Sequence, residues 1–121
     1  MQFDESQYSN PKLVKEIEAD YPEMTDEFKR ICVHQYEVFC MKQSNYGPGN
    51  IAVGTSLTTD DDVHLSLTGL WFRVNDKVQR LKQLVVLRKQ DNVGETLTDT
   101  FQDLSVYGII AQLVKNGKWA K

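Results

Sequence analysis

Apolar residues recur at intervals of three and four over most of the chain, a spacing that places them on one side of an α-helix. The pattern predicts four helices, spanning residues 11–21, 25–43, about 70–90 and about 95–115. Asn10 is a good helix cap, Pro11 suits a first helical position, and Asn116-Gly117 is a common helix end. We therefore predict an all-α protein, an antiparallel helical bundle of three long helices plus a short N-terminal helix.

The segment between the second and third predicted helices is less regular. Residues 44–50 hold two glycines and a proline, which predicts a tight loop, and residues 51–58 are expected to be irregular. Thr58-Thr59 followed by three aspartates is typical of a capped helix start, although residues 63–67 alternate as a strand would. A lone strand would have no pairing partner, so we predict a helix there.

The last predicted helix is apolar on two faces. One row, expected to face the core, consists of Leu97, Phe101, Leu104, Gly108 and Ala111. On the opposite side, three acids four residues apart continue into an apolar row, and together these are Glu95, Asp99, Asp103, Val106, Ile110 and Leu113. A helix that is apolar all round is normally buried. The acids are therefore expected at the end of a face that turns inward.

Buried carboxylates are costly unless a cation pairs with them. The acidic row thus predicts a cation site with Glu95, Asp99 and Asp103 as candidate ligands, of which only an adjacent pair can reach one ion. The alternative is that this helix begins in solvent, where the helix dipole favours acids at the N-terminus. The sequence leaves both interpretations open.

Two other positions combine charge with a core-like pattern. Lys42 extends the apolar face formed by residues 28–39 of its helix, so we expect it either to snorkel into solvent or to meet an acid. Asp76 and Arg80 are one turn apart and form a surface ion pair in the simplest interpretation. If another helix covers them, Asp76 becomes a candidate metal ligand and Arg80 a phosphate binder.

Composition narrows the class of protein. A chain of 121 residues with 40% hydrophobic content fits one helical domain over residues 1–121, and a net charge of -3 argues against an extended nucleic-acid surface. Cys32 and Cys40 are about 12 Å apart along one helix, too far to bridge, and are expected to be buried free thiols. No apolar run of membrane-spanning length and no signal peptide is present, so we expect a cytoplasmic protein without a membrane partner.

Three blocks, in order, carry a family resemblance. They are Lys42-x-x-Asn45-Tyr46-Gly47, then Gly69-Leu70-Trp71-Phe72-Arg73-x-Asn75-Asp76-Lys77-x-x-Arg80-Leu81-Lys82, then Glu95-x-x-x-Asp99-Thr100-x-x-Asp103-Leu104-x-x-Tyr107. Over residues 26–115 the chain resembles the nucleotide modification associated domain family, first type, which is typical of phage genomes. The resemblance implies a small helical domain linked to deoxynucleotide metabolism, in the host cytoplasm.

The chain is also distantly similar to the MazG-type all-α nucleoside triphosphate pyrophosphohydrolases. Those enzymes hold magnesium against a triphosphate with helix-borne acids, typically a Glu-x-x-Glu on one helix and a Glu-x-x-Asp on another. This chain departs from that pattern, because its acids are four residues apart on one helix and Asp76 stands alone on the other.

Together the residues and the resemblance predict one site for a nucleotide or nucleoside triphosphate with Mg²⁺. Its expected substrate-binding residues are Lys42, Asn45, Tyr46, Asn75, Lys77 and Arg80. Its expected metal ligands are Asp76, Glu95, Asp99 and Asp103, with Glu95 and Asp99 also placed in catalysis. Whether the phosphate is hydrolysed stays open.

Two alternatives remain beside this site. The first is a non-catalytic module that binds or sequesters a nucleotide, and the second is a protein-interaction domain whose charges neutralise one another. Because a three-helix bundle of this size has difficulty covering two apolar faces on its last helix, we also predict a homodimer or a higher homo-oligomer.

Overall fold

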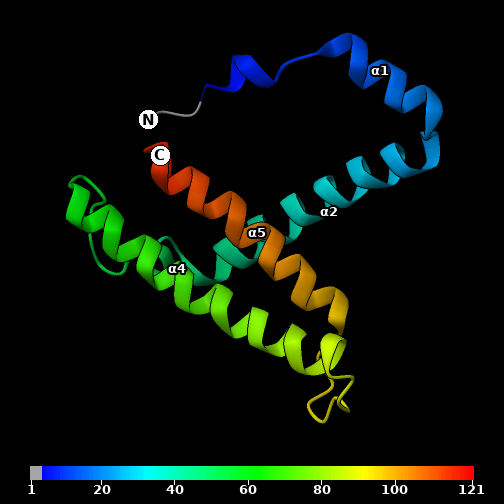
Figure 1. Cartoon of the computed structure of the whole chain (residues 1–121). Coiled ribbons are helices and arrows are strands. Elements are labelled where there is room, and N and C mark those ends of the chain that lie inside the picture. Colours follow the sequence, from blue (N-terminus) through cyan, green and yellow to red (C-terminus); the bar gives the residue numbers. More distant parts are fainter. Residues whose placement is uncertain (1–3) are drawn as a thin grey trace. The chain divides into compact units, whose positions relative to one another are not determined.

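The structure is a computed structural model that describes residues 4–121, and these residues are 75% helical with no strand among them. Its α-helices are α1 (Pro11–Asp20), α2 (Pro22–Tyr46), α3 (Gly49–Ala52), α4 (Asp60–Leu81) and α5 (Leu97–Lys115) (Figure 1). A 3-10 helix, η1 (Glu5–Tyr8), precedes them, and a π-helical turn, η2 (Lys82–Val86), follows α4. The all-α prediction is confirmed, whereas one antiparallel bundle of three long helices stays a prediction.

The chain divides into two compact units, with the boundary between Val38 and Phe39 inside α2. In the first unit α1 has no buried residue, and the apolar face expected on α2 is exposed at Phe28 and Ile31, so that part of the core prediction is wrong. The single-domain prediction for residues 1–121 stays a prediction, and its first three residues lie outside the described ones.

Side-chain caps fix the helix starts. Asn10 and Thr59 accept hydrogen bonds from the backbone N–H groups of Leu13 and Asp62, so both predicted starts are confirmed. The prediction that α2 begins at Thr25 is wrong. Pro22 takes the first helical position instead, where its missing N–H costs nothing, and the Thr25 hydroxyl donates to the Tyr21 carbonyl oxygen.

The connection between α2 and α4 is shorter than predicted. The helix α2 continues to Tyr46 and ends where Gly47 takes a φ of 69°, a conformation that favours glycine. The short helix α3 then buries Ile51, so residues 51–58 are not wholly irregular. From Asp60 the chain forms one continuous helix to Leu81, so the predicted helix over residues 60–67 is confirmed. This α-helix ends well before residue 90, where the sequence had predicted its end.

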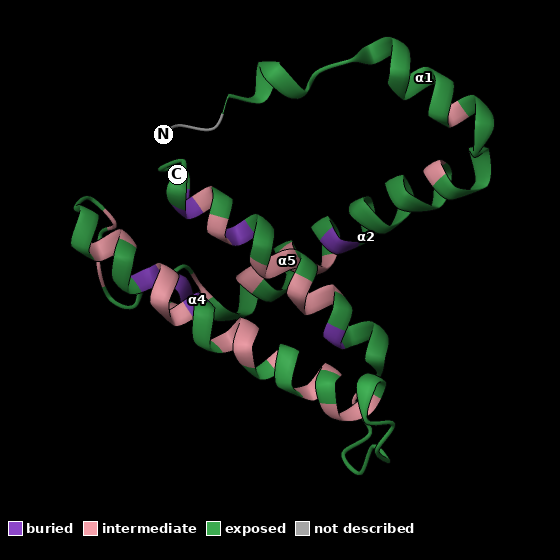
Figure 2. Cartoon of the chain, viewed as in Figure 1, coloured by how far each residue is buried: buried purple, intermediate pink, exposed green. Residues whose placement is uncertain are grey.

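The second unit contains the hydrophobic core. It consists of Ile51, Ala52, Leu70, Ile110, Val114 and Trp119. The ring of Trp119 stacks on Phe39 with centroids 6.0 Å apart, and its Nε1 donates to the Pro48 carbonyl oxygen at 3.1 Å. Figure 2 shows the buried residues on α4 and α5 as short stretches between intermediate and exposed ones. The core is therefore narrow, and both helices keep an uncovered side.

The row of α5 that was expected to face the core does so at Ala111, which packs against the core, but the prediction is wrong at the start of the helix. Leu97 and Phe101 are exposed, whereas Thr100, Ile110 and Val114 are buried. The inward turn of the opposite row is confirmed at Ile110. The difference arises because α4 packs against the side of α5 that carries Thr100, and Phe101 is rotated about 100° from that contact.

The two cysteines on α2 are free, as predicted, but both are exposed rather than buried. Gln35 is the one residue of α2 that is buried in the described chain, so most of this helix, including both cysteines, is open to solvent. No helix in the described part of the chain is both long and apolar enough to cross a membrane.

Candidate functional site

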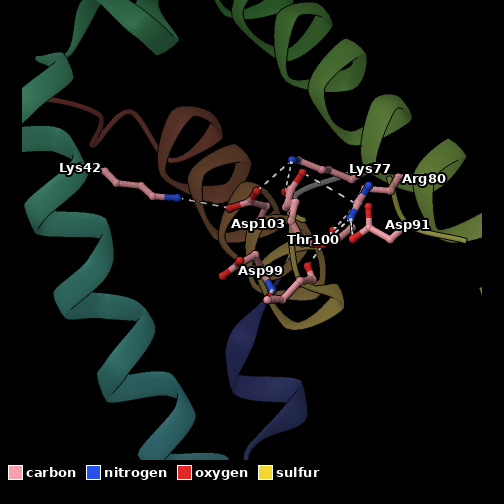
Figure 3. A network of polar contacts seen from close by, with 9 residues as sticks. Lys42, Lys77, Arg80, Asp91, Asp99, Thr100 and Asp103 are labelled. Atoms are coloured by element: carbon pink, nitrogen blue, oxygen red, sulfur yellow. Dashed lines mark hydrogen bonds and ion pairs between the residues drawn. The ribbon is translucent and has the colours of Figure 1, made fainter. Parts of the chain in front are cut away.

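Two cations on α4 face α5 and the segment before it. Lys77 and Arg80 are three residues apart, so both project from one side of α4. The Lys77 ammonium lies 3.0 Å from an Asp103 carboxylate oxygen and 3.1 Å from a Glu95 carboxylate oxygen (Figure 3). One ammonium therefore joins an acid of α5 to an acid that precedes α5.

Glu95 reaches this position from outside the helix. The helix α5 begins at Leu97, with Thr96 as its N-cap, so the predicted continuous row of three helical acids is wrong. A helical Glu95 would lie on the same side as Asp99, but from its position before the helix it meets Lys77 and approaches Arg80 Nε at 3.8 Å. The cap at Thr96 separates Glu95 from the two helical acids.

Arg80 ties the segment before α5 to the helix itself. Its Nε donates to the Thr100 hydroxyl at 3.1 Å, and its Nη2 donates to the Glu95 carbonyl oxygen and, at 3.2 Å, to the Asp91 carboxylate. Thr100 is fully buried. Arg80 thus satisfies one buried side chain, one backbone carbonyl and two acids.

A third cation comes from α2. The Lys42 ammonium lies 3.3 Å from the second oxygen of Asp103, and its side chain is half exposed. This confirms that Lys42 meets an acid. We call the group formed by Lys42, Lys77, Arg80, Asp91, Glu95, Thr100 and Asp103 the polar cluster; its three cations and three acids carry no net formal charge.

Two members of the polar cluster, Lys77 and Asp91, have pKa values shifted from their ordinary ones. Burial lowers the pKa of Lys77, but hydrogen bonds to Asp103 and Glu95 outweigh burial, so the pKa stands above its ordinary value. The pKa of Asp91 is lowered, mainly because the Val93 N–H donates to its carboxylate and, to a smaller extent, because Arg80 is near. Both shifts favour the charged forms, as expected for paired ions.

Other predicted site residues lie outside the polar cluster. Asp99 is exposed, and within the described chain its carboxylate contacts no cation; only its backbone N–H is engaged, by the Thr96 cap. Asp76 is also exposed and does not pair with Arg80, so the predicted surface ion pair is wrong because Arg80 binds Asp91 and Glu95 instead.

The polar residues at the end of α2 and in mid-α4 also stay apart from these ion pairs. Asn45 and Tyr46 are exposed in the last turn of α2, and Asn75 accepts a hydrogen bond from Gln79 along the surface of α4. The structure therefore brings together Lys42, Lys77, Arg80, Glu95 and Asp103 but not Asn45, Tyr46, Asn75, Asp76 or Asp99.

The sequence interpretation assigned no role to two members of the polar cluster, Asp91 and Thr100. Asp91 lies outside any helix, where periodicity carries no signal, although its carboxylate accepts from the Val93 N–H as turn aspartates often do. Thr100 stands between the two apolar rows of α5, and its burial and its contact with Arg80 show its role only in the structure.

A separate apolar hollow of about 300 Å³ lies beside Trp119. Phe39, Gln43 and Leu113 line it together with the C-terminal residues, and none of the predicted site residues does. Among the described residues, no group of three or more His, Cys, Asp or Glu side chains is arranged to hold a metal ion.

Comparisons of the chain with protein-family models, with curated proteins and with solved structures found no match. The resemblance to the nucleotide modification associated domain family therefore stays a prediction, and the function is argued below from the polar cluster.

Proposed function

We propose that the polar cluster binds the phosphates of a nucleotide or nucleoside triphosphate together with Mg²⁺. The observation that carries the proposal is the Lys77 ammonium between the carboxylates of Glu95 and Asp103, at 3.1 and 3.0 Å. Because both carboxylates contact one ammonium, small side-chain movements would bring them onto one metal ion. Mg²⁺ is commonly held by one or two protein carboxylates, with water and substrate phosphates as its other ligands.

Binding would proceed by exchange of partners. Glu95 and Asp103 would hold the Mg²⁺, and Lys77, freed from both acids, would turn with Arg80 to the phosphate oxygens. Lys42 can follow because its side chain is half exposed, and exposed ion pairs contribute only about 0–1 kcal/mol. Lys77 would exchange Glu95 and Asp103 for phosphate oxygens, and Lys42 would exchange Asp103, while Arg80 keeps Asp91 as a partner.

The nucleoside part of the ligand is assigned from the family resemblance. Asn45, Tyr46 and Asn75 belong to its blocks and lie outside the ion pairs, which suits contacts with a base or sugar rather than a phosphate. A deoxynucleotide of phage metabolism, bound within an antiparallel bundle, is the ligand that the resemblance implies.

Calorimetric titration with deoxynucleoside triphosphates, with and without Mg²⁺, tests the proposal. We expect binding that requires the metal, and an affinity at least about tenfold lower in Asp103→Asn, because a metal ligand is lost. Asp61→Asn is the matched control, since Asp61 is exposed in the first turn of α4, outside the polar cluster. Metal-independent binding, or unchanged affinity in Asp103→Asn, would contradict the proposal.

Hydrolysis is a separable extension of the same proposal. Asp99 follows the Thr96 cap and presents an exposed carboxylate without a cation partner in the described chain, so it is the candidate base for activating water. Asp99→Asn should lower pyrophosphate or phosphate release about 100-fold or more while leaving affinity within about twofold. Absence of turnover for every nucleotide, with binding retained, would identify a non-catalytic binding module.

One observation favours a second candidate, a protein-interaction domain whose polar cluster is architectural. All three cations of the polar cluster already have acid partners within 4 Å. In that case no nucleotide would raise the melting temperature, with or without Mg²⁺, and Lys77→Met would destabilise the fold by leaving Glu95 and Asp103 without Lys77.

A further inference from the structure

The pair formed by α4 and α5 carries an uncovered apolar side. Trp71 and Val78 are 59% and 46% exposed on α4, and Leu97 and Phe101 are 40% and 53% exposed on α5. With the half-buried or small residues between them they form what we call the hairpin face: Leu67, Trp71, Val74 and Val78 on α4, and Leu97, Phe101, Leu104 and Gly108 on α5.

The two halves of the hairpin face lie on the same side of the pair. On α4, Trp71 comes directly after Leu70, which is buried in the core. Val78 comes directly after Lys77, which contacts α5. On α5, Phe101 likewise follows Thr100, whose hydroxyl binds Arg80. One residue is a rotation of about 100°. Because the helices are antiparallel, equal rotations along both lead to one side.

The antiparallel register also fixes which residues lie level. Lys77 contacts Asp103 and Arg80 contacts Thr100, so Val78 lies level with Phe101, and Trp71 with Gly108. A Cβ added to Gly108 would meet nothing within 4 Å. The hairpin face therefore presents the large indole ring of Trp71 level with Gly108, a helical glycine that no other described residue of the second unit covers.

The hairpin face carries no charge along its length. The charged residues of segments 67–78 and 97–111 all lie on other sides of the two helices, and they are Arg73, Asp76, Lys77, Asp99 and Asp103. An uncharged face can meet a copy of itself without opposing like charges, which an isologous contact requires. A strongly charged partner would find no complement there.

The size of the hairpin face also suits a second copy. Its exposed fractions correspond to about 500 Å² of apolar surface, as large as the patches that mark interaction sites on soluble proteins. Two copies would bury about 1,000 Å² of apolar area, near the lower limit for a specific interface before any rim contacts are added.

We propose that the hairpin face is the interface of a homodimer, in which the α4–α5 pair of one chain packs against the same pair of a second copy and the large side chain of Trp71 approaches an open Gly108 position. The result is a four-helix arrangement around an apolar seam. The proposal is independent of nucleotide binding, because no residue of the hairpin face belongs to the polar cluster.

Light scattering at tens of micromolar tests the dimer, for which we expect about twice the 13.9 kDa of one chain. Phe101→Glu should give the single-chain mass, because it would bury an unpaired carboxylate in the seam. Phe72→Glu is the matched control, since Phe72 is 63% exposed on α4 but lies a further 100° from α5. Circular dichroism of both variants verifies that the helices remain.

Tryptophan emission supplies a second readout. Trp119 is buried in the core, so a spectral shift on dilution reports Trp71, and it should move to longer wavelength and disappear in Trp71→Phe. A wild-type mass of 13.9 kDa at every concentration overturns the proposal. A dimer that survives Phe101→Glu, or that Phe72→Glu dissociates equally well, also overturns it, because the interface would lie elsewhere.

Discussion

At the scale of single residues, the buried hydroxyl of Thr100 connects the core to the polar cluster. It accepts a hydrogen bond from Arg80 Nε at 3.1 Å and donates to the Thr96 carbonyl oxygen at 3.4 Å. A buried donor that loses its acceptor costs more than the hydrogen bond itself contributed, because it was removed from water. Thr100 therefore supports Arg80 rather than simply filling space.

Thr100→Val should lower the free energy of unfolding by about 1–3 kcal/mol, since the variant keeps the shape but leaves Arg80 Nε without this acceptor. Urea denaturation followed by circular dichroism measures the change. Thr98→Val, at an exposed position of the same helix, is the control and should stay within about 0.5 kcal/mol of wild type. Equal effects of the two substitutions would remove Thr100 from this role.

Asp91 should make stability depend on acid pH. Its pKa is lowered in the folded chain, mainly by the Val93 N–H and less by Arg80, so its contribution is present above about pH 4 and is lost as pH falls through the lowered value. The stability difference between wild type and Asp91→Asn should therefore be larger at pH 7 than at pH 3. Urea titrations at both values measure it, and a difference that grows on acidification contradicts the assignment.

At the scale of elements, the start of α5 decides the geometry of the polar cluster. The Thr96 side chain accepts the Asp99 N–H at 3.0 Å, which begins the helix at Leu97 and leaves Glu95 in the preceding segment. From there Glu95 reaches both Lys77 and Arg80. A helix that began two residues earlier would turn Glu95 onto the side of Asp99.

Thr96→Ala should destabilise the fold by about 1 kcal/mol, the usual effect of removing an N-cap. Thr98→Ala, also at the start of α5 but outside the cap, should change stability by less than about 0.5 kcal/mol. Thermal or urea unfolding compares the two. A Thr96→Ala variant as stable as Thr98→Ala would show that tertiary contacts alone hold the start of α5.

At the scale of the whole molecule, buried residues are unevenly distributed between the two units. The core residues all lie in the second unit, whereas α1 in the first has no buried residue. Helical hydrogen bonds without buried apolar side chains open readily. Backbone amides of residues 11–20 should therefore exchange with deuterium at least about 100-fold faster than those of residues 104–114, as measured by mass spectrometry of peptides. Equal protection would contradict this.

The polar cluster and the hairpin face share no residue, so their functions should separate. Phe101→Glu is expected to abolish the dimer and leave nucleotide affinity within about threefold, since Phe101 contacts none of the cluster's ion pairs in the described chain. Calorimetry on the variant measures the affinity. Loss of binding together with the dimer would mean that the second copy completes the site.

Local chemistry in the sequence determined most of the helical framework. Asn10 and Thr59 cap helices because each side chain accepts a hydrogen bond from the backbone N–H three residues later. Asn116-Gly117 ends α5 because glycine tolerates the φ of 68° found at Gly117. The position of Lys42 at the end of an apolar face left two expectations, that it snorkels into solvent or that it meets an acid, and the structure shows the second. These features depend on neighbours a few residues away.

The tertiary structure alone decided which faces pack. Both rows of α5 are apolar and both were predicted to turn inward; only the contact with α4 decided that Ile110 is buried while Phe101 is exposed. Likewise Asp91 and Glu95 join Arg80 only because the segment before α5 folds back along α4. Such pairings depend on long-range geometry, which residue spacing within one helix does not encode.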